Sequence, residues 1–180
     1  MTKIKNNKVI LIDADVVSHF LRAGKITVLT KIFKTPIKIL DVVYNELKEW
    51  KGRQKEIENL ITFKLLEVIA FPQTNSEIAK EFFWIKKSRY YGDGEAACMS
   101  YAKFTKNIIA SNNLKDTKNY CNLHSVDYLT TMDFLSRAMS EGIFTLEDCN
   151  NFMNKNSVSK NPFPVKKMEN FKPRNISHIL

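Results

Sequence analysis

Two aspartates follow directly on an apolar run near the start of the chain. Asp13 comes immediately after Val9–Ile12, and Asp15 lies two residues further on. A carboxylate in this position can cap the following helix, because its oxygen accepts hydrogen bonds from the first backbone N–H groups. It can also serve chemistry at the end of a buried strand. We expect the capping role for Asp15 and take Asp13 as the first candidate for a functional acid.

Three more acids lie near the starts of later helical segments. Glu46 lies one turn into the helix predicted after Ile37–Leu40, and Asp93 and Glu95 flank Gly94. Each acid has an ordinary structural role open to it, as a solvated helix residue, a helix cap or a first-turn acid that the helix dipole favours. Those separate roles do not explain why acids recur at the same point of successive units. Carboxylates brought together in this way are ligands that hard divalent cations prefer.

The elements that must position these acids can be predicted from the pattern. Apolar runs of strand length alternate with helical patterns, which predicts an α/β domain with a central, mostly parallel sheet of four to five strands flanked by helices. In such a sheet, ligands bind beyond the carboxyl ends of the strands, where Asp13 would lie. The predicted strands are Val9–Ile12, Ile37–Leu40, Leu65–Phe71, Asn107–Ala110 and Val126–Leu129. The predicted helices are Val16–Arg22, Ile26–Phe33, a helix to Trp50 capped by Asp41, a helix carrying Ile78 and Ile85 capped within 74–76, Glu95–Lys103, Asn113–Cys121, Met132–Ser140 capped by Thr131, and Leu146–Asn154 capped by Thr145.

The net charge of +9 favours an acidic partner. Nucleic acid is the commonest one, because Lys and Arg side chains that contact phosphates release condensed counterions. Residues 155–180 hold six Lys or Arg and one Glu, a net charge of +5, and Pro162, Pro164 and Pro173 predict an extended course there. We therefore expect a domain at 1–154 and a basic extended tail at 155–180. A solvated chain end explains the charge of the tail equally well.

The sequence also argues against several classes of protein. No apolar run approaches the ~20 residues that cross a bilayer, so we expect no membrane partner. The polar start of the chain is not a signal peptide, and Cys98, Cys121 and Cys149 are typical of reduced thiols, so the expected location is cytoplasmic. The three histidines lack ligand spacing, which argues against zinc, and we expect His19 to lie on a helix surface.

Four segments, taken in order, resemble the PIN-domain nucleases, many of which are VapC-type ribonuclease toxins. The segments are Val9–Val16, Val42–Leu47, Gly94–Ala97 and Ile108–Asn113, and the resemblance spans roughly residues 8–145. It implies a three-layer domain in which carboxylates hold one or two Mg²⁺ or Mn²⁺ ions. On the matching positions, Asp13, Glu46 and Glu95 would be metal ligands and catalytic residues. Asp15 falls where the family often has Asn, Ser or Thr, which supports the site by hydrogen bonding.

The fourth segment departs from the family pattern. Ser111 fits, but Asn112 stands where an acid is expected. Asn binds a hard cation through its carbonyl oxygen without supplying charge. Asp116, one turn further on, is the candidate for the missing metal ligand. Asp93, Ser111 and Asn112 are expected to support the site.

A basic and aromatic segment precedes the Asp93–Glu95 acids. Lys86, Lys87 and Arg89, followed by Tyr90 and Tyr91, are of the types that track a nucleic-acid backbone, and they are the candidates for RNA binding. The alternative is a solvated helix end.

The resemblance implies a metal-dependent endoribonuclease that hydrolyses RNA phosphodiester bonds. It also implies that the chain is the toxin of a toxin–antitoxin pair, with an antitoxin protein that covers the acidic pocket, and a homodimer is a further expectation. One alternative is a haloacid-dehalogenase-like phosphatase in which Asp13 is the nucleophile, Asp15 the acid and base, and Ser111 the second motif. The other is a degenerate PIN domain that binds RNA or a protein without cutting, as Asn112 suggests.

Overall fold

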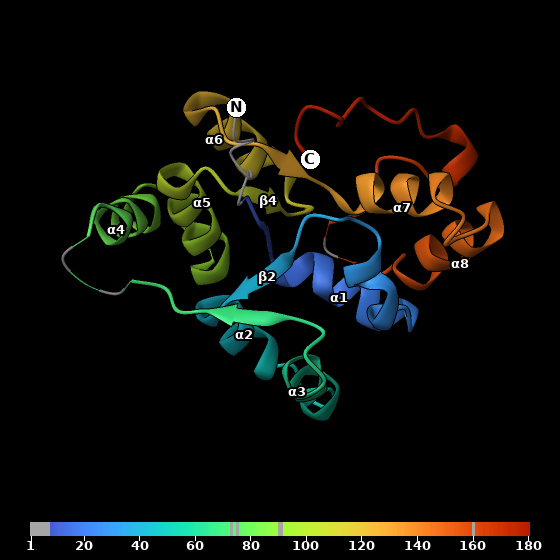
Figure 1. The fold of residues 1–180 in the computed structure, drawn as a ribbon, viewed down its shortest axis with the longest axis horizontal. Coiled ribbons are helices and arrows are strands. Elements are labelled where there is room, and N and C mark those ends of the chain that lie inside the picture. Colours follow the sequence, from blue (N-terminus) through green and yellow to red (C-terminus); the bar gives the residue numbers. More distant parts are fainter. Residues whose placement is uncertain (1–7, 73, 75, 90–91, 160) are drawn as a thin grey trace, which may run out of the picture.

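A five-stranded, all-parallel sheet forms the centre of the protein (Figure 1). The computed structural model describes residues 8–72, 74, 76–89, 92–159 and 161–180, with the backbone alone at 89 and 114–116. The sheet order is β3-β2-β1-β4-β5, and helices flank the sheet, which confirms the predicted three-layer α/β class. The strands are β1 (Ile10–Ile12), β2 (Ile37–Leu40), β3 (Glu67–Ile69), β4 (Ile108–Ala110) and β5 (Tyr128–Leu129).

The central strand β1 fixes the place of the first acids. All three residues of β1 are fully buried, as a continuous apolar run in a covered parallel strand should be. In the register of β1 and β4, Ile12 lies opposite Ala110. The residues after these two strands, Asp13 and Ser111, therefore leave the sheet side by side at its carboxyl edge.

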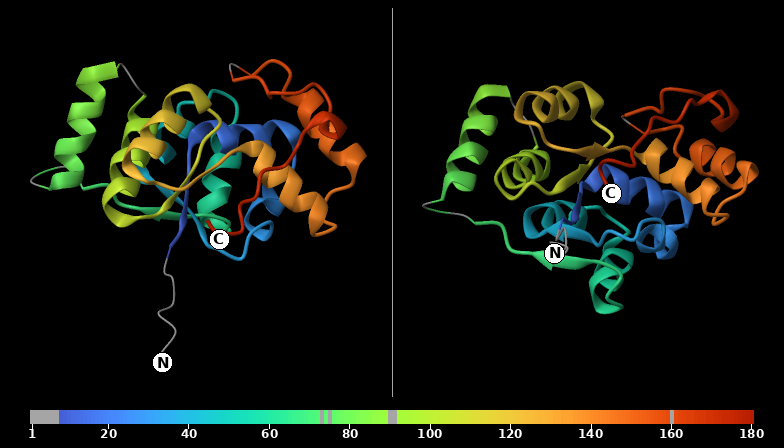
Figure 2. Two further views of the ribbon diagram at one scale, coloured as in Figure 1. Left: turned by 90° about the horizontal axis from the view of Figure 1, so that it is seen from above. Right: turned by 45° about the horizontal axis from the view of Figure 1, so that its top comes forward.

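Helices cover the sheet in two groups (Figure 2). One group consists of α4, α5 and α6, with α5 packed against α2 as well, and the other joins α1 to α7 and α8. Phe20 of α1 makes edge contacts with Phe134 of α7 and Phe152 of α8. The helices are α1 (Ala14–Ala23), α2 (Asp41–Lys48), α3 (Gln54–Thr62), α4 (Glu77–Arg89), α5 (Asp93–Thr105), α6 (Leu114–His124), α7 (Thr131–Ser140) and α8 (Leu146–Lys155), with 3₁₀ helices η1 (Ile26–Lys31) and η2 (Met168–Asn170).

Three predicted helix caps are wrong by one residue. Gly92 is the N-cap of α5, so Asp93 is the first helical residue and not the cap. Leu40 and Thr130 precede α2 and α7 in the same way, ahead of the predicted Asp41 and Thr131. The reason is visible at Thr130, whose side chain and the Asp133 carboxylate satisfy each other's backbone N–H groups as a capping box. The Thr145 cap of α8, with Asp148, is confirmed.

The helix predictions also failed between 24 and 64. Residues Ile26–Lys31 form a 3₁₀ helix where an α-helix was predicted, and the predicted helix to Trp50 ends at Lys48. The helix α3 was not predicted at all. Ile57 and Leu60 are buried and Ile61 packs against the core, a spacing that marks one face of a helix, so the signal was present and was overlooked.

Residues 156–159 and 161–180, which we call the C-terminal strap, lie against the domain and are not a freely solvated end. Met168 and Ile179 of the strap are buried. Arg174 donates to both carboxylate oxygens of Asp133 at 3.0 and 2.8 Å and also to the backbone oxygen of Tyr128. The described strap consists of turns, bends and irregular chain with one turn of 3₁₀ helix and no strand, so it does not run extended throughout as predicted.

Removal of the Arg174 guanidinium should loosen the strap. Because Asp133 is buried, it would lose two charge-assisted hydrogen bonds and keep only those from Thr130, at a cost of about 1–3 kcal/mol. We expect Arg174→Ala to lower the free energy of unfolding by this amount in urea titrations. Lys172→Ala, which removes an exposed strap cation, is the control and should change it by less than about 0.5 kcal/mol. Equal effects of the two variants would contradict the anchoring role of Arg174.

The expectation that His19 lies on a helix surface is wrong. His19 is fully buried, and its ring nitrogens bond Thr131 Oγ1 at 3.0 Å and Ser159 Oγ at 2.9 Å. The ring of Phe163 lies against it, with 5.0 Å between ring centroids. His19 thus joins α1, α7 and the strap. Burial, and then the charge of Arg22, lower the pKa of His19 from 6.5 to about 4.

The low pKa of His19 predicts an acid-sensitive fold. The His19 side chain takes up a proton near pH 6.5 in the unfolded chain but only near pH 4 in the folded protein. The stability that the fold has above pH 6.5 is therefore lost as the pH falls from 6.5 to about 4. The loss should reach about 2–3 kcal/mol at 1.36 kcal/mol per pH unit. His19→Gln, which cannot take up the proton, should lose less stability between pH 7 and 4.5 in urea titrations. Parallel pH curves for the two proteins would contradict this.

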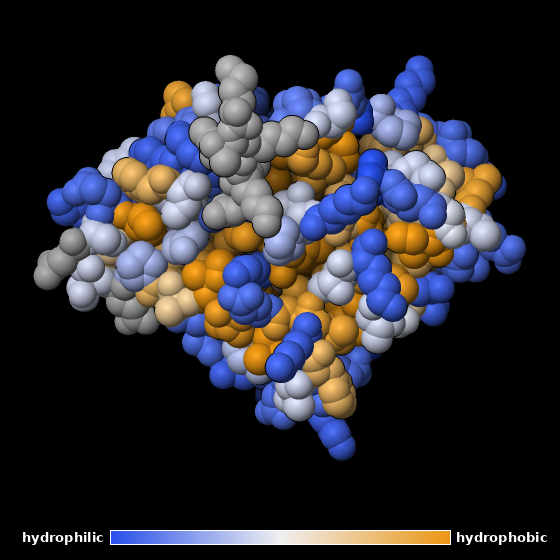
Figure 3. All heavy atoms as spheres, viewed as in Figure 1, coloured by the Kyte–Doolittle hydropathy of each residue, from blue (hydrophilic) through white to orange (hydrophobic). Residues whose placement is uncertain are grey.

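The face seen in Figure 1 carries hydrophobic residues across its middle and hydrophilic residues around its rim (Figure 3). The edge strand β3 is only partly covered, and Phe63 is 67% exposed.

No helix in the described part of the chain is long and apolar enough to cross a membrane.

Candidate active site

Asp13 lies at the end of the central strand and caps α1. Its Oδ1 accepts a hydrogen bond from the N–H of Ala14 at 2.8 Å, and its own N–H donates to the backbone oxygen of Ala110 at 2.9 Å. The Ser111 hydroxyl donates to Asp13 Oδ2 at 3.3 Å. The strand end and the neighbouring strand thus hold Asp13 in one place, with little exposure to solvent.

Asp15 is not the predicted helix cap. It lies in the first turn of α1, and its Oδ2 accepts a hydrogen bond from the N–H of Asn112 at 2.8 Å. Burial raises the pKa of Asp15 to about 6, although the amides of Asn112 and Asn161 oppose the shift. Its Oδ1 is buried and has no hydrogen-bond partner among the described residues. An unpaired carboxylate oxygen in this position is costly unless something else binds it.

Glu46 reaches the site from α2 through a contact with a glycine. The N–H of Gly94 donates to Glu46 Oε1 at 2.8 Å. A Cβ atom at position 94 would lie 2.5 Å from Glu46 Oε2 and 3.1 Å from a methyl carbon of Val43. Glycine is therefore required at position 94 for the Glu46 carboxylate to lie against the first turn of α5.

Glu95 is held from α6 and the loop before it. Its Oε1 accepts hydrogen bonds from Asn113 Nδ2 at 2.9 Å and from Thr117 Oγ1 at 3.0 Å. These two donors lie four residues apart and so lie on one side of the start of α6. Asn113 also donates its N–H to Ser111 Oγ at 3.3 Å, which links Glu95 to the partner of Asp13.

The four acids act on one another electrostatically. Burial raises the pKa of Asp13 well above its ordinary value, and the charges of Asp15, Glu95 and Glu46 raise it further, against the hydrogen bond from Ala14. Burial also raises the pKa of the Cys98 thiol on α5, and the same four carboxylates contribute to that shift. Acids from three separate parts of the sequence therefore lie near enough to Asp13 to raise its pKa.

Other predicted site residues lie further from this cluster or are not described. The Asn112 side chain donates to the backbone oxygen of Asn161 at 3.2 Å, so it turns towards the strap. Asp93 is mostly exposed and pairs with Lys86 of α4. Lys87 is exposed on the same helix.

Two of the predicted side chains remain untested. Arg89 and Asp116 have a helical backbone, but their side chains lie outside the described part of the structure, as do Tyr90 and Tyr91 altogether. The predictions that they bind RNA and metal therefore stay predictions.

The carboxylate oxygens of the four acids are of the type that binds a hard divalent cation, although hydrogen bonds from the protein occupy several of them. Within the described ranges, no group of three or more His, Cys, Asp or Glu side chains is arranged so that it could hold a metal ion. Two observations nevertheless fit a cation: the unpaired Oδ1 of Asp15 and the mutual repulsion that raises the pKa of Asp13. Asp13, Asp15, Glu46 and Glu95 carry oxygen ligands of the type that Mg²⁺ or Mn²⁺ prefers, and they would have to come closer together to hold such an ion.

Sequence reasoning missed three contributors to the site. Asn113 and Thr117 both fix Glu95, and Asn161 brings the strap to Asn112. The signal for the first two was available, because they follow strand β4 as the acids follow β1. For Asn161, 49 residues from Asn112, the sequence carries no such signal.

Comparison of the chain with models of known protein families and with curated proteins gave no match. The class of protein is therefore defined by the fold and the site alone. It is a three-layer α/β protein with a cluster of four acids at the carboxyl edge of a parallel sheet.

Proposed function

We propose that this protein is a metal-dependent endoribonuclease. The observation that carries the proposal is the convergence of Asp15, Glu46 and Glu95 on the buried Asp13, whose pKa they raise. Repelling carboxylates at the ligand-binding edge of a parallel sheet destabilise the fold unless a cation or a proton compensates them. The choice of RNA rests on the four ordered segments that resemble PIN-domain nucleases, and the net charge of +9 agrees with a polyanionic substrate.

The residues divide into holding and supporting roles. Asp13, Glu46 and Glu95 would hold Mg²⁺ or Mn²⁺, which supplies a Lewis acid that lowers the pKa of a water and neutralises phosphate charge. Ser111 holds Asp13, and Asn113 holds Glu95. These hydrogen bonds fix the carboxylates before a substrate arrives, which reduces the cost of organising the site.

The partners of the site follow from the same proposal. Lys86 and Lys87 lie near the end of α4, the helix that precedes α5 and its Glu95 in the chain, and would meet the RNA backbone there. A role as the toxin of a toxin–antitoxin pair, an antitoxin that covers the acids, and a homodimer all rest on the family resemblance alone. Analytical ultracentrifugation of the purified chain tests the homodimer separately.

The test is cleavage of labelled structured RNA by purified protein in Mg²⁺, Mn²⁺ or EDTA. We expect cleavage with a divalent ion, none in EDTA, and none by Glu95→Gln. Glu147→Gln is the matched control, because Glu147 is an exposed acid of α8, remote from the cluster, and it should retain full activity. Metal-independent cleavage, or equal loss in both variants, would overturn the proposal.

The contact between Ser111 and Asp13 keeps the phosphatase as a second candidate. A phosphatase of that kind has no use for Glu46 or Glu95, yet both act on Asp13. A generic phosphomonoester assayed beside the RNA separates the two functions. Hydrolysis of the monoester that survives Glu95→Gln but not Asp13→Asn would establish the phosphatase.

A binding protein without catalysis is the third candidate. It is favoured by Asn112, whose side chain bonds to the strap, and by the protein donors that already satisfy Glu95. Such a protein would bind RNA in EDTA and show little affinity for Mn²⁺ in calorimetry. A nuclease should bind Mn²⁺ and lose that affinity in Asp13→Asn.

A further inference from the structure

A small cavity lies between the strap and the ends of β5 and α7. It has a volume of about 150 Å³ and is lined on the domain side by Tyr128, Met132 and Asn112, and on the strap side by Pro164 and Phe171. Asn112 also donates its backbone N–H to Asp15. The cavity is therefore the immediate neighbour of the acidic cluster, with Asn112 as the wall between them.

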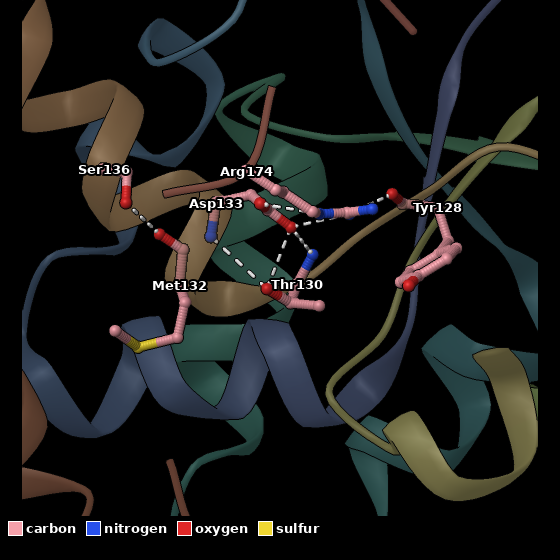
Figure 4. Close-up of polar contacts among 6 residues, drawn as sticks. All are labelled: Tyr128, Thr130, Met132, Asp133, Ser136 and Arg174. Atoms are coloured by element: carbon pink, nitrogen blue, oxygen red, sulfur yellow. Dashed lines mark hydrogen bonds and ion pairs between the residues drawn. The ribbon is translucent and has the colours of Figure 1, made fainter. Parts of the chain in front are cut away.

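Side chains at one end of the cavity hold one another by hydrogen bonds and an ion pair (Figure 4). The guanidinium of Arg174 lies over the ring of Tyr128, 4.3 Å from its centroid, and is held by both oxygens of Asp133. Asp133 is fixed in turn by the N–H and the hydroxyl of Thr130. A wall whose side chains are held in this way loses little conformational entropy when a ligand binds.

The size and lining of the cavity select a flat ring. A cavity of about 150 Å³ accommodates one six-membered ring. Phe171 and Tyr128 line the cavity with aromatic rings, although Arg174 covers one face of Tyr128, and Pro164 adds a flat apolar surface. Aromatic and apolar surfaces of this kind are those on which nucleic-acid bases stack. The side-chain oxygen of Asn112 makes no hydrogen bond within the described part of the chain and can meet the edge of a base. A pyrimidine fills a space of this size, whereas a purine would extend beyond it.

A lysine without an acidic partner in the described part of the chain lies at the rim of the cavity. Lys118 of α6 is exposed, lines the cavity, and makes no hydrogen bond or ion pair within the described part of the chain. The guanidinium of Arg174, by contrast, is neutralised by Asp133. Lys118 is therefore placed to meet a phosphate next to a base that lies in the cavity.

We propose that this cavity binds one pyrimidine base of the RNA strand whose neighbouring phosphodiester lies at the acidic cluster. The inference rests on the proposed ribonuclease function and adds a base preference to it. Phe171 and Tyr128 hold the ring, and Lys118 holds the phosphate attached to that nucleoside. The base then sets which phosphodiester bond reaches Asp13.

Binding can be measured without catalysis. In EDTA, NMR titration with UMP, CMP, AMP and GMP should shift the signals of Met132, Thr130 and Tyr128 with the two pyrimidine nucleotides only. Phe171→Ala should weaken UMP binding by about fivefold or more, the lower end for stacking of one base. Lys118→Gln should weaken UMP binding but not uridine binding, whereas the charge-matched Lys166→Gln should change neither. Shifts confined to other residues, or equal purine binding, would overturn the inference.

Cleavage of RNA separates failure of the inference from failure of the nuclease. If Asp13-dependent cleavage shows no pyrimidine preference and Lys118→Gln and Phe171→Ala leave kcat/KM unchanged, the nuclease stands and the cavity proposal falls. If pyrimidine nucleotides bind as described but no RNA is cut, the cavity stands as a base-binding site and the nuclease falls. Circular dichroism shows whether Phe171→Ala folds, and Lys118→Gln, a surface change, carries the test if it does not.

Discussion

Asp13→Asn should abolish RNA cleavage and at the same time make the metal-free protein more stable. Asparagine caps a helix as well as aspartate, so its oxygen can still accept from the Ala14 N–H. The change removes the charge that Asp15, Glu95 and Glu46 repel. It also removes the carboxylate that the proposed function assigns to the metal ion as its central ligand. A ligand worth several kcal/mol to the transition state corresponds to a loss of about 10³-fold or more in kcat/KM.

The stability arm of this prediction has a defined pH dependence. The pKa of Asp13 is higher in the folded protein than its ordinary value of 3.8. As the pH rises above 3.8, the carboxylate therefore ionises more readily in the unfolded chain, and this lowers the free energy of unfolding. The gain from Asp13→Asn should therefore be absent near pH 3.5 and grow towards pH 8 in thermal melts with EDTA. Saturating Mn²⁺ should raise the melting temperature of the native protein and not of the variant. A variant less stable than the native protein at pH 8 in EDTA would contradict the repulsion among the four acids.

Gly94→Ala should damage catalysis far more than folding. The added Cβ would meet Glu46 Oε2 at 2.5 Å, and that oxygen is the end of a flexible side chain that can turn away. Alanine also favours the helical backbone more than glycine does, by about 0.5–1 kcal/mol, which offsets part of the crowding against Val43. Displacement of one catalytic carboxylate by about 1 Å costs on the order of 10²-fold in rate. We expect that loss in kcat/KM, with a melting temperature within a few degrees of the native value.

The matched control for Gly94→Ala is Gly92→Ala. A Cβ at position 92 would lie 3.8 Å from Glu46 Oε1, which is ordinary contact. Position 92 is an N-cap with φ near −60°, which alanine can adopt, so its activity should fall by less than about threefold. If both variants kept full activity, Glu46 would not belong to the site. If Gly94→Ala failed to fold, the contact with Val43 rather than the one with Glu46 would decide the outcome.

The sheet and the first acid could be predicted because local patterns specify them. A run of four apolar residues that ends in Asp13 describes a covered parallel strand and the residue at its carboxyl end. Glu95 follows from the same rule, since it lies in the first turn of a helix after a break, whereas Glu46 lies in the second turn of α2 and depended on the family resemblance. The fold class needs only the alternation of such units, and the structure confirms it.

The hydrogen bonds that fix the site could not be predicted in this way. Gly94 contacts Glu46 across 48 residues of sequence, and Asn112 contacts Asn161 across 49. Such contacts depend on how helices and strap pack, and packing leaves no periodic signal in the sequence. The burial of His19 could not be predicted either, because the strap that covers it is a charged, proline-rich segment, which is typical of a solvated chain end.

The strap gives the site an order of assembly during translation. Synthesis runs from the N-terminus at about 5–20 residues per second, and domains fold as their segments emerge. Asp13 leaves the ribosome early, Glu95 follows much later, and Asn161 and Phe171 come only after all five strands. The nascent chain thus carries its first acid for on the order of ten seconds before the strap can close beside it. Until the strap has emerged, Asn112 and His19 lack the strap groups that they contact in the folded protein.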